Sequence, residues 1–264
     1  MTDDFENTAG YFLELASEQR LKILHNLSIK SFGVTQLATK LDVTAQEVHR
    51  NLDRLSKSNF TKKGMNDKYE ITTQGKIMLS QMSLVKFLTK NEKFFENHNL
   101  QLIPSKFTKR LGVLGTSEHI RGVTKVLEKW TSIYKNADSY IADIVSESPP
   151  GMIKPLVSRI QNGVEYRHIV SNNLIEPENR EEILKKTGYY KLVQKGKIQR
   201  KTTKTVSTIV LLNEKESAVI FPSTTNETDL KHMFYSKDSA FHEWCIDYFD
   251  YIWKKSKTMR TKSN

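Results

Sequence analysis

The sequence predicts an α+β protein with two regions, in which a small helical region with one β-hairpin precedes an α/β domain. Three observations support this prediction. Apolar residues recur at helical spacing through roughly the first ninety residues, and one stretch there alternates as strands do. Further along, short apolar runs alternate with amphipathic segments, as strands alternate with helices. The length of 264 residues suffices for two domains of ordinary size.

The composition is that of a globular protein with an excess of basic residues. The chain has 41 lysines and arginines against 30 acidic residues, a net charge of +11. Such an excess favours polyanions, of which nucleic acid is the commonest, although it can also serve solubility alone. Cys245 is the only cysteine, which excludes disulfide frameworks and clustered cysteine metal sites within one chain. The acidic, polar start is unlike a signal peptide and no run approaches the roughly 20 apolar residues of a membrane span, so we expect a cytoplasmic protein without membrane contact.

Three helices are predicted at the start of the chain. Ser17 can cap the helix "SEQRLKILHNL", and Thr35 the short helix "TQLATKL". After the turn "DVT", a third helix covers "VTAQEVHRNLDRL", where Thr44 and Glu47 have capping-box spacing. The stripe that this helix is expected to bury consists of Val48, Leu52 and Leu55.

A hairpin and a long helix follow. In "FTKKGMNDKYEITTQG" two alternating stretches flank the turn residues Gly64, Asn66 and Asp67, which predicts a β-hairpin with a basic tip. Thr73 is the predicted cap of a helix that reaches about Leu88. This helix has more apolar positions than one core-facing stripe requires, and is therefore a candidate dimerisation element, as is the aromatic last helix.

The order helix, helix, turn, helix, hairpin, helix resembles the winged helix-turn-helix domain of archaeal and bacterial transcription regulators of the ArsR and MarR type. The stretch that carries the resemblance is "VTQLATKLDVTAQEVHRNLDRLSKSNFTKKGMNDKYEITTQG". The resemblance implies that residues 11–90 bind double-stranded DNA, with the third helix in the major groove and the protein acting as a homodimer.

The second region is predicted to hold four strands and four longer helices. The strands are "SYIADIVSE", "VEYRHIVS", "VSTIVLLN" and "SAVIFPS". The helices are "TSEHIRGVTKVLEKWTSIYKNA", "PPGMIKPLVSRIQNG", "EPENREEILKKTG" and "SAFHEWCIDYFDYIWKKSK". The alternation predicts a mostly parallel sheet, or a mixed one because the last two strands are joined by the short turn "NEKE". We place a boundary near Pro104, with a linker at 91–104, an α/β domain at 105–258 and a disordered basic tail at 259–264.

A second resemblance covers this region. "ENHNLQLIPSKFTKRLGVL", "NGVEYRHIVS" and "FHEWCIDYFDYIWKKSK" are similar to landmarks of the archaeal methanogenesis regulatory protein family. That family implies an effector-type domain related in fold to phospholipase D, which senses a small-molecule effector, dimerises, or both. Phospholipase D chemistry requires a histidine with a lysine two residues on, and none of the seven histidines has one. P-loop, dinucleotide-fingerprint and nucleophile-elbow motifs are also missing from the sequence, so we expect no enzyme activity and no cofactor.

The exposed face of the third predicted helix supplies the DNA-contact candidates. Arg50 can make a bidentate contact to guanine, Gln46 can pair with adenine, and His49 could serve either purpose. Thr44 at the helix N-terminus can hold a phosphate. The full candidate set is Thr35, Thr44, Gln46, His49, Arg50, Arg54, Lys62, Lys63 and Lys68. The alternative is that these are simply the solvated positions of an amphipathic helix and hairpin.

The excess of positive charge does not coincide with this region. Residues 1–100 hold 14 basic and 12 acidic residues, which leaves 27 and 18 for the remainder. The segment from Lys185 to Thr205 alone has eight basic residues and no acidic one. It could be a second nucleic-acid contact, a pocket for an anionic effector, or a solvated lysine-rich surface.

A ligand pocket is predicted at the ends of the first two strands of the second region. Asp143, His168 and Ser171 lie on or after these strands, and ligands usually bind at the carboxyl ends of strands in open α/β sheets. The histidines show no metal-ligand spacing, so no metal is expected. Two other functions stay open: a phosphoester- or nucleic-acid-processing enzyme with a winged-helix docking domain, and a winged-helix module that binds proteins.

Overall fold

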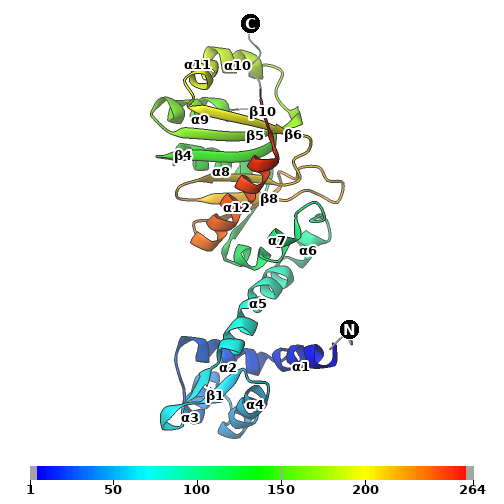
Figure 1. The fold of residues 1–264 in the computed structure, drawn as a ribbon, viewed down its shortest axis with the longest axis vertical. Coiled ribbons are helices and arrows are strands. Elements are labelled where there is room, and N and C mark those ends of the chain that lie inside the picture. Colours follow the sequence, from blue (N-terminus) through cyan, green and yellow to red (C-terminus); the bar gives the residue numbers. More distant parts are fainter. Residues whose placement is uncertain (1–4, 150, 260–264) are drawn as a thin grey trace. The chain divides into compact units, whose positions relative to one another are not determined.

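The computed structural model describes residues 5–149 and 151–259, which form two compact units (Figure 1). The division falls between Val85 and Lys86, within helix α5 (Thr73–Lys90). The sequence placed the boundary later, near Pro104, yet the segment 91–104 belongs to the second unit. Apart from Met259, the predicted basic tail lies outside the described residues.

The first unit is a winged helix-turn-helix, as the sequence predicted. Its elements before α5 are α1 (Phe5–Leu15), α2 (Glu18–Ile29), α3 (Val34–Leu41), α4 (Ala45–Lys57), β1 (Thr61–Lys63), a 3-10 turn (Met65–Asp67) and β2 (Tyr69–Ile71). Helix α1 starts upstream of the domain limit at residue 11 that the sequence suggested, because the apolar pattern continues back through Phe5.

Two predicted helix caps are present in the first unit. The Ser17 hydroxyl accepts a hydrogen bond from the N–H of Arg20 at 3.4 Å, at the start of α2. The Thr44 hydroxyl accepts one from the N–H of Glu47 at 3.2 Å, at the start of α4. These bonds satisfy backbone donors that the first turn of a helix leaves free.

Two other predicted caps are wrong by one or two residues. Thr35 lies inside α3, and the N-cap is Gly33, whose N–H donates to the side chain of Gln36 at 3.0 Å. At α5 the cap is Thr72 and not Thr73, because the Thr72 hydroxyl accepts a first-turn N–H at 3.0 Å. At α5 the neighbouring threonine takes the cap position, whereas at α3 the cap is a glycine that has no side-chain acceptor, so the polar residue nearest the helix start does not identify the cap.

The core of the first unit fixes both α4 and the wing. Its fully buried side chains include Leu24, Leu37, Val48, Leu52, Leu55 and Phe60. The hairpin is tied to the connection before α3, because Tyr69 donates its N–H to the carbonyl of Phe32 at 2.8 Å and accepts one in return at 3.2 Å. The wing is thus held beside α3 and α4 by backbone pairing as well as by packing.

The second unit contains an eight-stranded mixed sheet in the order β10-β6-β5-β4-β7-β8-β9-β3. The strands are β3 (Glu118–Arg121), β4 (Tyr140–Glu147), β5 (Glu165–Ile175), β6 (Ile198–Thr203), β7 (Ile209–Asn213), β8 (Ser217–Ile220), β9 (His232–Ser236) and β10 (Lys257–Thr258). Among the strands of the described residues, only the pairs β4–β5 and β5–β6 are parallel. Of the two predicted alternatives the mixed sheet is therefore confirmed, and the mostly parallel one is wrong.

Helices cover both faces of this sheet (Figure 1). They are α6 (Glu92–Phe95), α7 (Ser105–Thr108), a 3-10 helix (Leu111–Thr116), α8 (Val123–Lys135), α9 (Ile153–Gln161), α10 (Arg180–Lys186), α11 (Tyr189–Gln194) and α12 (Ser239–Lys255). Residues of α8, α9, α10 and α11 share one core with alternate residues of β4 to β9. Helix α12 packs against β4, β7 and β8. Strand β7 is buried along its whole length, as expected for a strand covered on both faces.

Four strands differ from or were missing in the sequence prediction. The stretch "TSEHIRG" was assigned to a helix, but it forms β3, and Gly122 with a φ of 100° separates it from α8. Strands β6 and β9 were not predicted, and neither was β10, whose Lys257 the sequence prediction placed at the end of the last helix. Among the described residues, no helix is both long and apolar enough to cross a membrane.

Candidate functional site

Helix α4 has one buried and one exposed face, as predicted. Gln46, His49 and Arg50 are all exposed, and their spacing of three and four residues puts them on one side of the helix. The opposite side carries the three fully buried residues Val48, Leu52 and Leu55. The buried stripe therefore sets the direction in which the polar side chains project.

Two surface grooves border this exposed face. A groove of about 450 Å³ lies between the start of α3 and the wing, and its lining includes Thr35, His49, Lys63 and Lys68. A second groove of about 490 Å³ follows the start of α4 and is lined by Thr44, Gln46, Glu47, His49 and Arg50. His49 belongs to both. Seven of the nine predicted DNA-contact residues thus share this surface, and Arg54 and Lys62 do not line either groove.

Arg54 points to a different partner. Its Nε and Nη2 donate to the two carboxylate oxygens of Glu14 at 3.0 and 2.6 Å. The hydrogen bond from Arg54 is the main reason that the pKa of Glu14 is lowered. Arg20 contributes as well, with its Nε 3.2 Å from the same carboxylate. Arg54 therefore joins α4 to α1 instead of projecting with Arg50.

The basic residues of the wing are not equally free. Lys63 forms an ion pair with Asp67 at 2.8 Å, which raises the pKa of the lysine. Lys62 lies 3.9 Å from Glu70, its cross-strand partner. Within the described part of the chain, Lys68 and Arg50 form no ion pair, and their charges are the most available for a partner.

The structure adds groove residues that the sequence did not single out. Asn66 at the wing tip, with a left-handed φ of 56°, lines the groove beside Lys68, as do Gln36 and Tyr69. The turn composition predicted the bend at Asn66 but not its place next to α3, because that follows from the pairing of the wing with Phe32.

A polar cluster is buried in the second unit around Asp143. This carboxylate accepts hydrogen bonds from the hydroxyls of Tyr134 at 2.5 Å and Tyr166 at 2.8 Å. It also accepts one from Nδ1 of His168, on the neighbouring strand. Burial and the adjacent carboxylate raise the pKa values of both tyrosines well above the usual range, so they act as donors.

Two of the three predicted pocket residues meet, and the third does not. Asp143 and His168 are paired in register on β4 and β5. Ser171 lies three residues after His168, which puts its side chain on the opposite face of the strand, and its hydroxyl accepts the N–H of Asn173. The prediction that Ser171 faces the same crevice is therefore corrected by strand alternation.

His168 lines a small cavity of about 30 Å³ on the face of the sheet that α8, α9, α10 and α11 cover. Other residues of its wall include Trp130, Tyr134, Tyr166, Arg180 and Tyr189. The sequence did not identify these residues as a site. The alternation of Tyr166 with His168 was a usable signal, but the contributions of α8, α10 and α11 depend on tertiary packing.

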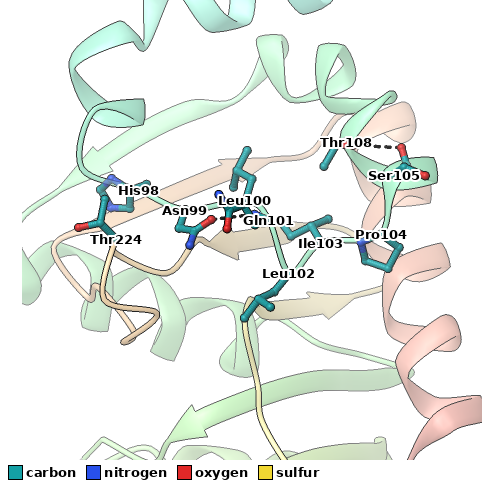
Figure 2. Close-up of a pocket in the computed structure, with 10 residues that line it drawn as sticks. All are labelled: His98, Asn99, Leu100, Gln101, Leu102, Ile103, Pro104, Ser105, Thr108 and Thr224. Carbon is teal, nitrogen blue, oxygen red and sulfur yellow. Dashed lines mark hydrogen bonds between the residues drawn. The ribbon is translucent and has the colours of Figure 1, made fainter.

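A larger, open groove of about 880 Å³ lies along the segment from His98 to Ser105 (Figure 2). Its polar groups are mostly uncharged and bound to the protein itself: Asn99 accepts the N–H of Gln101, and His98 Nδ1 donates to the carbonyl of Phe94 at 2.6 Å. Among the described residues, no group of three or more His, Cys, Asp or Glu side chains could hold a metal ion.

Comparison with known proteins gives distant likenesses to solved structures. No family model and no curated protein matches the chain. TrmBL2, described as an archaeal chromatin protein with a novel mode of DNA binding, is 14% identical over 98% of this chain and 100% of its own, with a TM-score of 0.43. Nuc, a phospholipase D family member from Salmonella typhimurium, is 13% identical over 55% of this chain and 99% of its own, with a TM-score of 0.41. IdeR from T. acidophilum is 10% identical over 84% and 99%, with a TM-score of 0.23. At these values the likenesses carry no argument about function.

Proposed function

We propose that the protein is a DNA-binding transcription regulator that acts as a homodimer, with α4 in the major groove and without enzyme activity. The observation that carries the proposal is the two-sided character of α4. Because Val48, Leu52 and Leu55 are fully buried, Gln46, His49 and Arg50 lie on the surface. All three line the groove at the start of α4, and His49 also lines the groove beside the wing. In a winged helix this is the face that meets base edges.

The chemistry of the exposed groups fits that role. Arg50 has no ion pair within the described residues, so its guanidinium is available for the bidentate contact to guanine. The Thr44 hydroxyl accepts the N–H of Glu47 and keeps its own proton, which it can donate to a phosphate at the helix N-terminus. Lys68 offers a further unpaired charge at the wing.

The homodimer is proposed from exposed apolar side chains in the first unit. Phe12 on α1 is 62% exposed and Ile77 on α5 is 59% exposed, and Phe5 and Leu13 on α1 are exposed as well. Phe5, Phe12 and Leu13 recur at helical spacing on α1, and an exposed apolar helix face is typical of interaction surfaces. A second copy of the chain would cover them and present a second recognition helix to a symmetric site.

The test is DNA binding by the full chain. Duplexes selected from a random pool would be titrated by fluorescence anisotropy, and Arg50→Ala is expected to weaken specific binding by about 1–3 kcal/mol and to relax one base position. Lys76→Ala, at an exposed position of α5, is the control and should leave the affinity unchanged. Sedimentation of the complex should give two chains per selected site.

Three outcomes would contradict parts of this proposal. If Arg50→Ala keeps the affinity and specificity of the unchanged chain, α4 is not the reading element. A complex with a single chain per site would argue against the homodimer. Degradation of the DNA on addition of Mg²⁺ would favour the rival view that the protein is a nucleic-acid-processing enzyme.

A further inference from the structure

The small cavity in the second unit lies beside a row of three ionisable side chains, of which His168 lines it. Asp143, His168 and Arg200 are register partners on the adjacent strands β4, β5 and β6. The wall toward the carboxyl end of β4 is completed by Glu147 from the strand and Arg180 from α10. The cavity therefore lies near the strand ends where ligands commonly bind in sheets with parallel strands.

The carboxylate in this row is already fully satisfied. Asp143 accepts hydrogen bonds from Tyr134, Tyr166 and His168, and its side chain has no solvent exposure. Because Nδ1 of His168 is used for this bond, Nε2 is the ring nitrogen left for another partner. A ligand in the cavity would not need to neutralise or hydrogen-bond Asp143.

Unlike Asp143, two hydrogen-bond donors near the cavity lack a well-aligned partner. Trp130 is only 1% exposed, and its indole N–H is close enough to the Tyr134 hydroxyl to act against the rise in that group's pKa, but within the described residues it makes no well-aligned hydrogen bond. The Nε–H of Arg200 is also buried without an acceptor in that part of the chain. Both groups can only donate, and leaving a buried donor without an acceptor is unfavourable. What the site lacks is an acceptor.

Two guanidinium groups stand on the side of the cavity away from Asp143, and they are the groups that can meet an anion. Arg180 contacts Glu176 at 2.8 Å and Ser148 at 3.3 Å. Arg200 lies 5.8 Å from the ring of Tyr189, which is part of the wall. Burial raises the pKa of Tyr189 to about 12, and the charges of Arg200 and Arg180 act against that rise. Burial also raises the pKa of Glu147, which disfavours its negative form.

We infer that this cavity binds a small oxyanion, a phosphate or carboxylate group, which accepts hydrogen bonds from Trp130, Arg180 and Arg200 next to His168. The volume of about 30 Å³ exceeds the roughly 10–15 Å³ needed by a single water. The remaining wall is aromatic and aliphatic, with Met152 and Leu156 from α9, as in sites for small organic molecules. The inference does not depend on DNA binding, since it concerns the second unit alone.

The test is isothermal titration of the full chain, without DNA, with sodium phosphate and separately with sodium acetate at constant ionic strength. One of the two anions is expected to bind saturably at one site per chain. Arg180→Gln should weaken this binding at least tenfold, and Trp130→Phe, which keeps an aromatic ring but removes the N–H, several-fold. Arg121→Gln, at an exposed position of β3, is the matched control and should bind as the unchanged chain does.

The two anions distinguish the sources of the oxyanion, since preference for phosphate or for acetate indicates which group the natural ligand carries. Melting temperatures of the variants, with and without the anion, separate loss of binding from loss of folding. The inference is overturned if neither anion binds at millimolar concentration. It is also overturned if Arg180→Gln and Trp130→Phe, both folded, bind as tightly as the control.

Discussion

Single side chains of similar type have different roles in this protein because of what surrounds them. Arg50 and Arg54 are one helical turn apart on α4, but Arg54 is bound to both oxygens of Glu14 while Arg50 projects beside a groove. The sequence assigned both to DNA because both lie outside the buried stripe. Only the position of α1, which follows from tertiary packing, separates them.

Glu214 shows the same dependence on position in the second unit. It follows β7, and its carboxylate accepts the backbone N–H groups of Asp138, Ser139 and Tyr140 at 2.8, 3.2 and 3.4 Å, at the start of β4. Burial alone would raise the pKa of Glu214, but these bonds outweigh it and lower the pKa to about 2. The charged carboxylate thus ties the end of β7 to the start of β4.

This pKa predicts how stability depends on pH. Because the folded pKa of Glu214 lies below its usual value of 4.5, the charged form stabilises the fold above pH 4.5, and this contribution is lost as the pH falls toward 2. Glu214→Gln should therefore be less stable than the unchanged chain at pH 7, with a difference that shrinks between pH 4.5 and 2. Urea unfolding across this range measures it, with Glu118→Gln at an exposed position as the control. A difference that stays constant with pH would contradict the assignment.

At the scale of elements, the first turn of α5 approaches the hairpin more closely than a side chain would allow. A Cβ atom at Gly75 would lie 2.2 Å from the carbonyl oxygen of Phe60 and 2.8 Å from Cγ1 of Ile71. Atoms of the backbone cannot give way as the end of a flexible side chain can. Glycine is therefore required here for the contact between two elements, although it is a poor helix former.

Gly75→Ala is accordingly expected to destabilise the winged helix by about 1–3 kcal/mol, the usual cost of overpacking. Intrinsic helix propensity predicts the opposite sign, a gain of up to about 1 kcal/mol. Gly10→Ala in α1 is the matched control, because a Cβ there would meet nothing within 4 Å, and it should show the gain. Thermal unfolding of both variants decides the matter: if Gly75→Ala melts at or above the temperature of the unchanged chain, the close approach does not constrain the fold.

Elements with a strong apolar pattern could be predicted from the sequence, and elements defined by distant partners could not. Helices α4, α9 and α12 and strands β4, β5, β7 and β8 were recognised because burial imposes a period on their side chains. Strand β3 was missed because it has four residues, three of them not buried, and exists by pairing with β9 more than a hundred residues later. The DNA-contact face of α4 stays a prediction that this pattern supports.

The candidate pocket was predictable only in part for the same reason. The order of strands alone put Asp143 and His168 on neighbouring strands, but the predicted place at the strand ends is wrong, because both lie inside β4 and β5. The hydroxyl groups that satisfy Asp143 come from Tyr134 on α8 and Tyr166 on β5, and Arg200 joins them through the register of β6. The register of neighbouring strands and the position of a helix on the sheet depend on tertiary packing, so they could not be predicted from a single sequence.

For the whole molecule, the distribution of charge limits how DNA can be bound. Up to Val85 the chain has 11 basic and 10 acidic residues. Since the whole chain has 41 basic and 30 acidic residues, the second unit has 30 basic and 20 acidic ones. Several of its lysines are already paired: Lys185 lies 3.8 Å from Glu181, and Lys186 forms an ion pair with Glu182. Both belong to the basic segment whose role the sequence left open. The available charge of the winged helix therefore rests on few groups.

The salt dependence of binding separates the two possible sources of phosphate contacts. Each neutralised phosphate contributes about −0.9 to the slope of log K against log salt concentration. Changing Lys68 of the wing, which forms no ion pair within the described residues, to glutamine should make the slope shallower by about 1. If the winged helix alone contacts the DNA backbone, changing Lys185, Lys186, Lys191 and Lys195 together to glutamine should leave the slope unaltered; two of them, Lys185 and Lys186, are already paired with neighbouring acids. If the salt dependence of binding becomes shallower in the four-lysine variant but not in the wing variant, the basic segment of the second unit contacts the DNA backbone. The winged helix then does not act alone.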